Sequence, residues 1–418
     1  MTSTMPAALI LGYARPEGVI RLIHETMRAG VERLYISLDG AIDPRVVKLQ
    51  SRLMQEIENL TLAPEVNITI WRSQTNTFAQ QRLARPEYGL VTPNSISVIE
   101  DNFILSKSPD IIHIHNWYNF LSIEQMERLG SRIPLVFTMH DERLLTGGCH
   151  YTLTCSGYMS DCSNCPAVKS GEYKIKKAKA DLARVMSTLP KFSLIAPSKW
   201  LIDRASASKP LSNAHQKVVI ANILGGEFYN INQGLSEAKE FTLVFASAVL
   251  NSPYKGLLLL MDALVILDKE LVKSNISLKV QLVGTGNPTD IPNEIKEITI
   301  EFLGGLSPSA FQSVLERSSL FVIPSIIDNA PSVISEAQIL GVPVIGSKVG
   351  GIGEMLDNGK SGYLCEPNPE DLARTILQTL LDPELNKIAE SGRMSALERH
   401  EPSVIVKKHI DIYQGLLS

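Results

Sequence analysis

The chain is predicted to be an α/β protein made of two doubly wound domains that face a cleft. Its 418 residues are too many for one ordinary hydrophobic core. Short apolar runs alternate with helical patterns along its length, which is typical of parallel sheets covered by helices. A polar, glycine-bearing segment at 225–240 separates two such series and is the predicted linker. Ligands are therefore expected at the carboxyl ends of the strands.

Strands are predicted where apolar or β-branched runs are bounded by turn residues. In the first half, the predicted strands cover residues 7–13, 33–39, 67–72, 110–115, 134–139, 192–197 and 217–222. In the second half, they cover residues 242–248, 278–284, 298–304, 319–325, 343–349 and 362–367. No internal repeat or low-complexity tract interrupts this order.

Composition narrows the class of protein. The net charge of −4 argues against nucleic acid as a partner, and five cysteines in this length do not indicate a disulfide scaffold. No apolar run approaches the ~20 residues that a membrane-spanning helix needs. Residues 1–6 lack the basic start and long apolar core of a signal peptide. We therefore expect a cytoplasmic protein, and the sequence gives no indication of its oligomeric state.

The stretch 323–356 has the most specific pattern. It reads as a strand end, a loop, a helix, a strand and then a glycine turn into another helix. Asp328 precedes the first of these helices, and Glu336 lies inside it, eight positions later. A helix N-terminus beside glycine backbone suits a phosphate, and carboxylates suit sugar or ribose hydroxyls. The stretch therefore indicates a nucleotide-sugar site, and the alternative is an ordinary well-capped helix.

This pattern resembles the donor site of retaining glycosyltransferases of the GT4 family, where two glutamates are spaced by seven residues. Here Asp328 stands in place of the first glutamate, and Glu336 matches the second. Three further segments resemble a subgroup of the same family that builds bacterial surface polysaccharides. They are DIIHIHNWYNFLSI, PLVFTMHD and TGGCHYTLTCSGYMSDCSNCP. The resemblance covers residues 105–400.

The resemblance implies a GT-B fold and a metal-independent, retaining transfer that uses no catalytic cofactor. It implies a nucleoside-diphosphate sugar of the UDP or GDP type as donor, and a saccharide or lipid-linked saccharide as acceptor. It divides the chain into an acceptor-binding domain at 1–228, a nucleotide-sugar-binding domain at 238–400 and a crossover helix at 401–418 that returns to the first domain.

Residue roles also follow from the resemblance. Lys255 is expected to bind the donor diphosphate, although the family's accompanying arginine is missing between residues 245 and 255. Glu336 is expected to accept hydrogen bonds from ribose hydroxyls, and Asp328 is expected to contact the sugar. Backbone and loop residues expected to line the same site are Gly284, Thr285, Gly286, Gly304, Gly305, Asn329, Ala330, Pro331, Ser332 and Val333.

Two histidines, His115 and His140, each end a predicted buried strand. A histidine there is often a satisfied polar cap, and this is the interpretation of His115. His140 occupies the family's Thr-x-His-Asp segment, so the resemblance implies that it lies against the transferred sugar, with Asp141 orienting the loop or the imidazole. Residues 13–18 are the expected acceptor contact, but they lack the glycine-rich loop common in the family.

A loop at 147–166 contains four cysteines, Cys149, Cys155, Cys162 and Cys165. Cys-x2-Cys is a zinc half-site, and four thiolates complete a tetrahedral structural zinc site, in which His150 is a possible replacement ligand. The alternatives are reduced loop thiols or a disulfide pair, and a cytoplasmic location disfavours the disulfide.

Residues 169–191 form a basic run that contains Lys174, Lys176, Lys177, Lys179 and Arg184. Such a run is usually a solvated helix face. The alternative is a cationic surface that makes peripheral contact with the inner face of the membrane, where a lipid-linked acceptor lies.

Two rival functions remain after the sequence has been read. One is a sugar-nucleotide epimerase, which shares the GT-B fold but performs elimination and addition. The other is a non-catalytic GT-B scaffold, which is prompted by the altered acid at Asp328 and by the atypical residues 1–75.

Overall fold

The computed structural model describes residues 8–12, 34–39, 66–71, 91, 100–106, 108–115, 117, 121–168, 172–224, 228, 241–274, 276–286 and 291–418. The predicted acceptor contact at 13–18 and most of the predicted linker lie outside these residues. The chain divides into two compact units: Met1–Ile223 together with Glu401–Ser418, and Leu224–His400. Each unit is built around one sheet.

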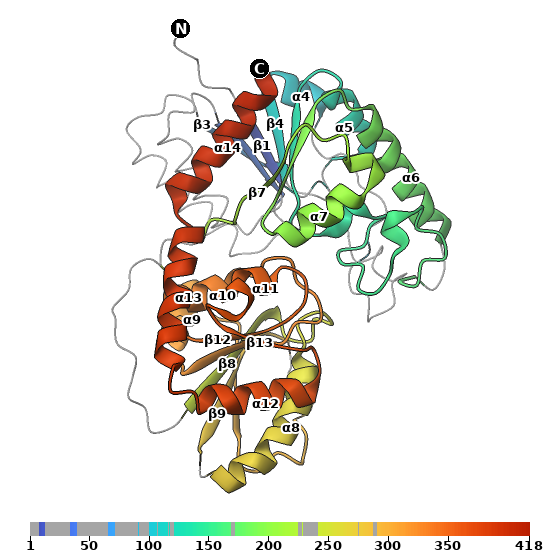
Figure 1. Ribbon diagram of the computed structural model, residues 1–418. Helices are drawn as coiled ribbons and strands as arrows, with labels where there is room; N and C mark the ends of the chain where they lie inside the picture. Colours follow the sequence, from blue (N-terminus) through green and yellow to red (C-terminus); the bar gives the residue numbers. More distant parts are fainter. Residues whose placement is uncertain are drawn as a thin grey trace. The chain divides into compact units, whose positions relative to one another are not determined.

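The first unit has a parallel sheet with the strand order β3-β2-β1-β4-β5-β6-β7 (Figure 1). Every neighbouring pair in it is parallel. The strands are β1 (Ala8–Gly12), β2 (Leu34–Asp39), β3 (Val66–Trp71), β4 (Ile111–His115), β5 (Leu135–Thr138), β6 (Phe192–Ala196) and β7 (Lys217–Val219).

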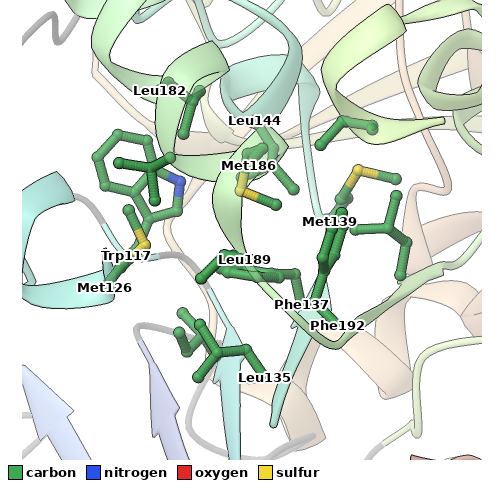
Figure 2. Close-up of a cluster of buried hydrophobic side chains, with 14 of the residues drawn as sticks. Trp117, Met126, Leu135, Phe137, Met139, Leu144, Leu182, Met186, Leu189 and Phe192 are labelled. Carbon is green, nitrogen blue, oxygen red and sulfur yellow. The ribbon is translucent and has the colours of Figure 1, made fainter. Parts of the chain in front are cut away.

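Helices cover one face of this sheet. They are α4 (Asp101–Ser106), α5 (Ile123–Gly130), α6 (Glu172–Thr188) and α7 (Lys199–Ala207), with short 3-10 turns at Glu142–Leu145, Gly157–Met159 and Lys209–Leu211. Ser122 and Ser198 begin α5 and α7 as N-caps, since their hydroxyls accept backbone N–H bonds. Figure 2 shows the core beneath these helices, to which neighbouring strands contribute Phe137 and Phe192 and the helices contribute Met126 and Met186.

The C-terminal helix α14 (Pro402–Leu417) packs on the other face of the first sheet. Side chains alternate along a strand, so Ile112 faces the α5–α6 core while Ile111 faces α14. Ile405, Val406, Ile410, Ile412, Tyr413 and Leu416 form the apolar side of the helix. The predicted crossover helix is confirmed.

The second unit has a parallel sheet with the order β10-β9-β8-β11-β12-β13. Its strands are β8 (Phe241–Val249), β9 (Leu278–Thr285), β10 (Thr299–Gly304), β11 (Leu320–Ile323), β12 (Val344–Ser347) and β13 (Tyr363–Cys365). Its helices are α8 (Leu257–Ser274), α9 (Pro308–Leu315), α10 (Ser332–Ile339), α11 (Ile352–Met355), α12 (Pro369–Leu380) and α13 (Leu385–Arg399).

Both faces of this second sheet are covered. Side chains of α8 and α12 form one core with Phe245 and Val280, and side chains of α9, α10 and α11 form the other with Val244 and Phe321. A strand buried on both faces needs the near-continuous apolar run that the sequence shows. The predicted α/β class with two doubly wound sheets is therefore confirmed.

The contacts divide the chain slightly earlier than the sequence suggests. Leu224 packs with Ile339 and Ala396, and Phe228 packs in the core beneath α10. Both therefore belong to the second unit, whereas the sequence assigned residues up to 228 to the first. The donor and acceptor roles of the two domains stay predictions.

Candidate active site

The second sheet changes winding direction between β8 and β11. From β8, the chain proceeds to β9 and β10 on one side, and then returns to β11, β12 and β13 on the other. The loops after β8 and β11 therefore leave neighbouring strands at the same edge, which is where doubly wound folds bind ligands. Lys255 lies in the loop after β8, and Asp328 lies in the loop after β11.

Lys255 and Asp328 form an ion pair in this place. The Lys255 Nζ lies 2.6 Å from the Asp328 Oδ2, and their side chains are 29% and 6% exposed. The Ser325 hydroxyl lies 3.4 Å from the same carboxylate oxygen, and the Asn329 N–H donates to Oδ1 at 3.1 Å. A nearly buried carboxylate is thus held by a cation that reaches solvent on one side.

Glycines let the backbone around this pair approach closely. Gly256 has a φ of +76°, and a Cβ there would lie 1.8 Å from the Pro324 carbonyl oxygen. Gly350 has a φ of +56°, and a Cβ there would lie 1.7 Å from the Asp328 carbonyl oxygen, which also accepts the Gly351 N–H at 3.0 Å. Only glycine fits at these two positions, because the contacted atoms are backbone.

The second predicted acid, Glu336, lies in the second turn of α10 and is 9% exposed. The helix begins directly after the Asp328 loop, with Pro331 as its N-cap. Asn329 is buried, while Ala330 and Val333 pack against the core beneath α10. The structure therefore brings Lys255 and Asp328 into contact and places Glu336 on the helix that follows them.

The predicted glycine segments lie at the ends of β9 and β10, the two strands on the other side of β8 from β11. Gly284, Thr285 and Gly286 close β9, while Gly304 and Gly305 close β10. Thr285 ties β9 to the β8 loop, because its hydroxyl donates to the Ala248 carbonyl at 2.6 Å and its carbonyl accepts the Leu250 N–H at 3.0 Å. A Cβ at Gly305 would lie 2.9 Å from the Thr285 methyl group, so the strand ends of β9 and β10 also converge.

In the first unit, His140 lies two residues after the end of β5 and is half-buried. It lines a small pocket whose other walls are Ile114, Trp117, Phe137, Thr138, Met139, Asp141, Arg143 and Leu144. The His140 Nε2 lies 3.1 Å from the His115 Nδ1. Burial lowers the pKa of His140, and the Asp141 carboxylate acts against this shift.

The Asp141 side chain contacts the loop that follows His140. Its carboxylate caps the 3-10 turn Glu142–Leu145 by accepting the Arg143 N–H at 2.8 Å, and it pairs with the Arg143 guanidinium. The His150 Nε2 lies 3.5 Å from the same carboxylate. These contacts agree with an orienting part for Asp141.

A set of buried polar side chains beneath α14 was missed by the sequence reading. His113 on β4 forms hydrogen bonds of 2.7 Å with the Tyr413 hydroxyl and with the Thr138 hydroxyl. His409 lies one turn before Tyr413, with its ring centroid 5.6 Å from that of His113. The only sequence signal was the His-x-His spacing at the end of β4, which places His113 and His115 on one face of the sheet.

The four loop cysteines are not joined in disulfide bonds. Cys162 and Cys165 are buried with Cys149 packed against them, and the Gly157 N–H donates to the Cys155 Sγ at 3.3 Å. The neighbouring Cys165 thiol and burial raise the pKa of Cys149. The described residues include all four cysteines. Among these described residues, no group of three or more His, Cys, Asp or Glu side chains lies close enough together to hold a metal ion. Zinc therefore stays a prediction.

The predicted basic run forms α6, and most of its cations have partners. Lys176, Lys177 and Arg184 pair with Asp161, Asp181 and Glu127. Lys179 is buried and donates to the Leu145 carbonyl at 2.6 Å. These contacts favour the solvated-face interpretation, and membrane contact stays a prediction. No helix in the described part of the chain combines the length and apolarity that crossing a membrane requires.

Comparison with known proteins finds similarity in the second unit. Residues 240–382 match the family model described as glycosyl transferases group 1. N-acetyl-alpha-D-glucosaminyl L-malate synthase of Bacillus anthracis is 33% identical over 153 residues, which cover 35% of this chain and 40% of that protein. Lipopolysaccharide 1,2-N-acetylglucosaminetransferase of Salmonella typhimurium is 30% identical over 187 residues, or 41% of this chain and 48% of that protein. The matches thus span less than half the length of these two relatives.

Solved structures extend the likeness to the whole chain at the level of the fold. Anabaena Alr3699/HepE in complex with UDP gives a TM-score of 0.63 at 16% identity, covering 98% of this chain and 100% of that one. Two parallel sheets and this likeness define the chain as a GT-B protein. Within that fold, residues 240–382 are the part of the chain that is similar to the glycosyl transferases group 1 model.

Proposed function

We propose that the protein is a retaining glycosyltransferase that moves a sugar from a nucleoside-diphosphate sugar to a saccharide or lipid-linked saccharide. The observation that carries this proposal is the Lys255–Asp328 ion pair at the edge where the second sheet changes winding direction. The complex of Alr3699/HepE with UDP supports UDP as the nucleotide. The lipopolysaccharide transferase of Salmonella supports a part in bacterial polysaccharide biosynthesis.

In this proposal each side chain of the site has one task. Lys255 places its cation beside the diphosphate, where negative charge develops as the sugar departs. Asp328 contacts the sugar, and Glu336 accepts hydrogen bonds from the ribose hydroxyls. His140, at the end of β5, contacts the transferred sugar. Because Lys255 supplies the charge that the leaving group needs, the transfer does not require a metal.

The ion pair gives the free protein a defined starting state. In the absence of donor, Lys255 and Asp328 neutralise each other at 2.6 Å. A diphosphate competes with Asp328 for the same cation, and Asp328 then becomes available to accept hydrogen bonds from the sugar. The acceptor hydroxyl attacks the anomeric carbon on the face from which the diphosphate departs, and its proton passes to the departing phosphate oxygen, so the configuration is retained and the rate depends on positioning.

The test separates transfer from its rivals. UDP-sugars are incubated with the protein with and without candidate saccharide acceptors, while UDP release and the anomeric configuration of the product are followed by NMR. We expect UDP release that depends on the acceptor, with retained configuration. UDP release without acceptor, together with an epimerised sugar, would instead identify an epimerase. Failure to bind any nucleotide sugar would identify a scaffold.

We further propose that the loop at 147–166 holds a structural zinc ion through Cys149, Cys155, Cys162 and Cys165. The donor set supports this, because four cysteines that form no disulfide lie in one partly buried loop. Zinc binding requires the loop to rearrange so that the four sulfur atoms approach one another. Bound zinc would then stabilise a polar loop that has little hydrophobic core of its own.

Metal analysis of untagged protein tests the zinc proposal. About one zinc per chain is expected, with loss in Cys162→Ser and retention in Cys365→Ser, because Cys365 is a buried core thiol on β13. Far less than one zinc per chain in the unaltered protein would refute it.

A further inference from the structure

The buried polar residues beneath α14 lead to the end of β5, where His140 lies. His113 and His115 are two positions apart on β4, so both point to the face on which Ile111 meets α14. Thr138 lies on the same side, since its hydroxyl bonds to His113. The rings of His113 and His115 have centroids 4.2 Å apart, and those of His115 and His140 are stacked at 5.4 Å.

His115 makes one hydrogen bond in this row, from its Nδ1 to the His140 Nε2 at 3.1 Å. Its other ring nitrogen, Nε2, is buried and has no hydrogen-bond partner among the described residues. His115 itself is 4% exposed. The unsatisfied nitrogen restricts which tautomer the ring adopts.

Both rings of the pair are neutral near pH 7, because burial lowers the pKa of His115 and of His140. A neutral imidazole carries one N–H and one bare nitrogen. Leaving a buried N–H without an acceptor is rarer and costlier than leaving an acceptor underused. The proton of His115 therefore belongs on Nδ1, and the bare nitrogen is the partnerless Nε2. In this tautomer His115 donates to the His140 Nε2.

We propose that His115 is a positioning residue for His140. By donating its Nδ1–H to the His140 Nε2, it fixes the His140 ring and keeps the single His140 proton on Nδ1. Any hydrogen bond that His140 donates to a bound sugar then comes from Nδ1. The kinetic consequence rests on the proposed function, in which His140 contacts the transferred sugar. The tautomer itself does not, because it belongs to the free protein.

The experiment uses the full chain labelled with 15N and reads the His140 tautomer from the long-range couplings of its ring nitrogens. His115→Leu and His115→Asn are a matched pair, because the two side chains have similar shape but only asparagine retains an N–H two bonds from Cβ. Tyr413→Phe removes the other end of the row, the hydroxyl that bonds His113 at 2.7 Å, and controls for loss of stability alone.

In the unaltered protein and in Tyr413→Phe, His140 is expected to carry its proton on Nδ1. In His115→Leu, a mixture of His140 tautomers is expected. Turnover is expected to fall about tenfold, which corresponds to about 1.4 kcal/mol in the activation free energy. The KM for the donor is expected to change less than about threefold. His115→Asn is expected to keep turnover within about threefold. A His140 tautomer that is the same in His115→Leu as in the unaltered protein overturns the proposal.

The NMR arm needs no donor, so it distinguishes this inference from the proposed function. If the tautomer shifts in His115→Leu but no transfer is found with any donor, the positioning is correct and the proposed function fails. If transfer is found and neither tautomer nor turnover responds to His115→Leu, the proposed function stands and the positioning fails.

Discussion

Lys255 and Asp328 form an ion pair that is buried on one side only. A carboxylate that is 6% exposed is costly to desolvate, and the cation beside it offsets that cost. Lys255 is 29% exposed, so it remains reachable from solvent. The pair is therefore more than a surface ion pair.

Removal of the cation alone is predicted to destabilise the protein. Lys255→Met leaves the Asp328 carboxylate without its cation, which lowers the free energy of unfolding by about 1–3 kcal/mol. Urea denaturation followed by circular dichroism measures this. The double variant Lys255→Met/Asp328→Asn is expected to recover most of the loss, because no unpaired buried charge remains. Additive losses in the double variant would show that the pair does not couple.

The sequence indicated candidate site residues one at a time, but it did not indicate which residues contact each other. Lys255 and Asp328 were found separately, each assigned to a different part of the donor, because 73 positions separate them and nothing local indicates a contact. The bond from His113 to Tyr413 joins residues 300 positions apart. His115 was interpreted as a satisfied cap, whereas one of its nitrogens has no partner in the described part of the chain.

At the scale of elements, the site depends on turns that only glycine permits. The turn after β12 carries Gly350 against the Asp328 carbonyl oxygen, and Gly351 donates to the same oxygen. The turn before α8 carries Gly256 against Pro324. Three loops from three strands are thus fixed against each other at the switch point.

A matched pair of glycine substitutions tests this arrangement. Gly350→Ala and Gly341→Ala both place alanine at positive φ, which costs about 1–2 kcal/mol in each. Only Gly350→Ala also sets a Cβ 1.7 Å from the Asp328 carbonyl oxygen, while nothing lies within 4 Å of the Cβ at Gly341. We expect the affinity for UDP to fall at least about tenfold in Gly350→Ala, which corresponds to about 1.4 kcal/mol of binding free energy. We expect no such fall in Gly341→Ala. Equal affinities in calorimetry would contradict the account.

The docking of α14 is predicted to weaken in acid. Burial lowers the pKa of His409 from 6.5 to about 4, so between these values the unfolded chain binds more protons than the folded one. The free energy of unfolding is therefore full above pH 6.5 and falls as the pH drops toward 4, by on the order of 3 kcal/mol for this residue. Burial also lowers the pKa values of His113 and His115.

Urea denaturation between pH 7.5 and 4.5 measures this dependence. His409→Asn keeps a side-chain N–H for the Ile405 carbonyl, which the His409 Nδ1 contacts at 2.8 Å, but it cannot titrate. Its pH slope is expected to be smaller than that of the unaltered protein by up to about 1.4 kcal/mol per pH unit. Identical slopes would show that His409 is not neutral in the folded state.

The elements themselves were predictable because their signals are local. Every predicted strand has a counterpart, and β4 and β11 are buried along their whole length. The last helix was predicted within 401–418 and is observed at Pro402–Leu417. Its preference for the first sheet came from the family resemblance, because periodicity indicates an apolar face but not its partner.

At the scale of the whole molecule, the two sheets follow one plan. Each places its first strand beside its fourth, so each has a switch point between them, at β1 and β4 and at β8 and β11. Predicted functional residues follow strands at or beside these points: Lys255 follows β8, Asp328 follows β11, and His140 follows β5, the neighbour of β4. The fold is shared by many activities, so the function rests on these side chains.

One calorimetric titration tests the central claim most directly, namely that Lys255 and Asp328 form a donor site with divided tasks. UDP and GDP are titrated into the unaltered protein, Lys255→Met and Asp328→Asn. Lys255→Met should weaken diphosphate binding about tenfold or more, because a charge-assisted contact is lost. Asp328→Asn should bind UDP as tightly as the unaltered protein or more tightly, since the competing carboxylate is gone, although its turnover falls. If Asp328→Asn weakens UDP binding as much as Lys255→Met does, or if neither changes it, the assignment of this site is contradicted.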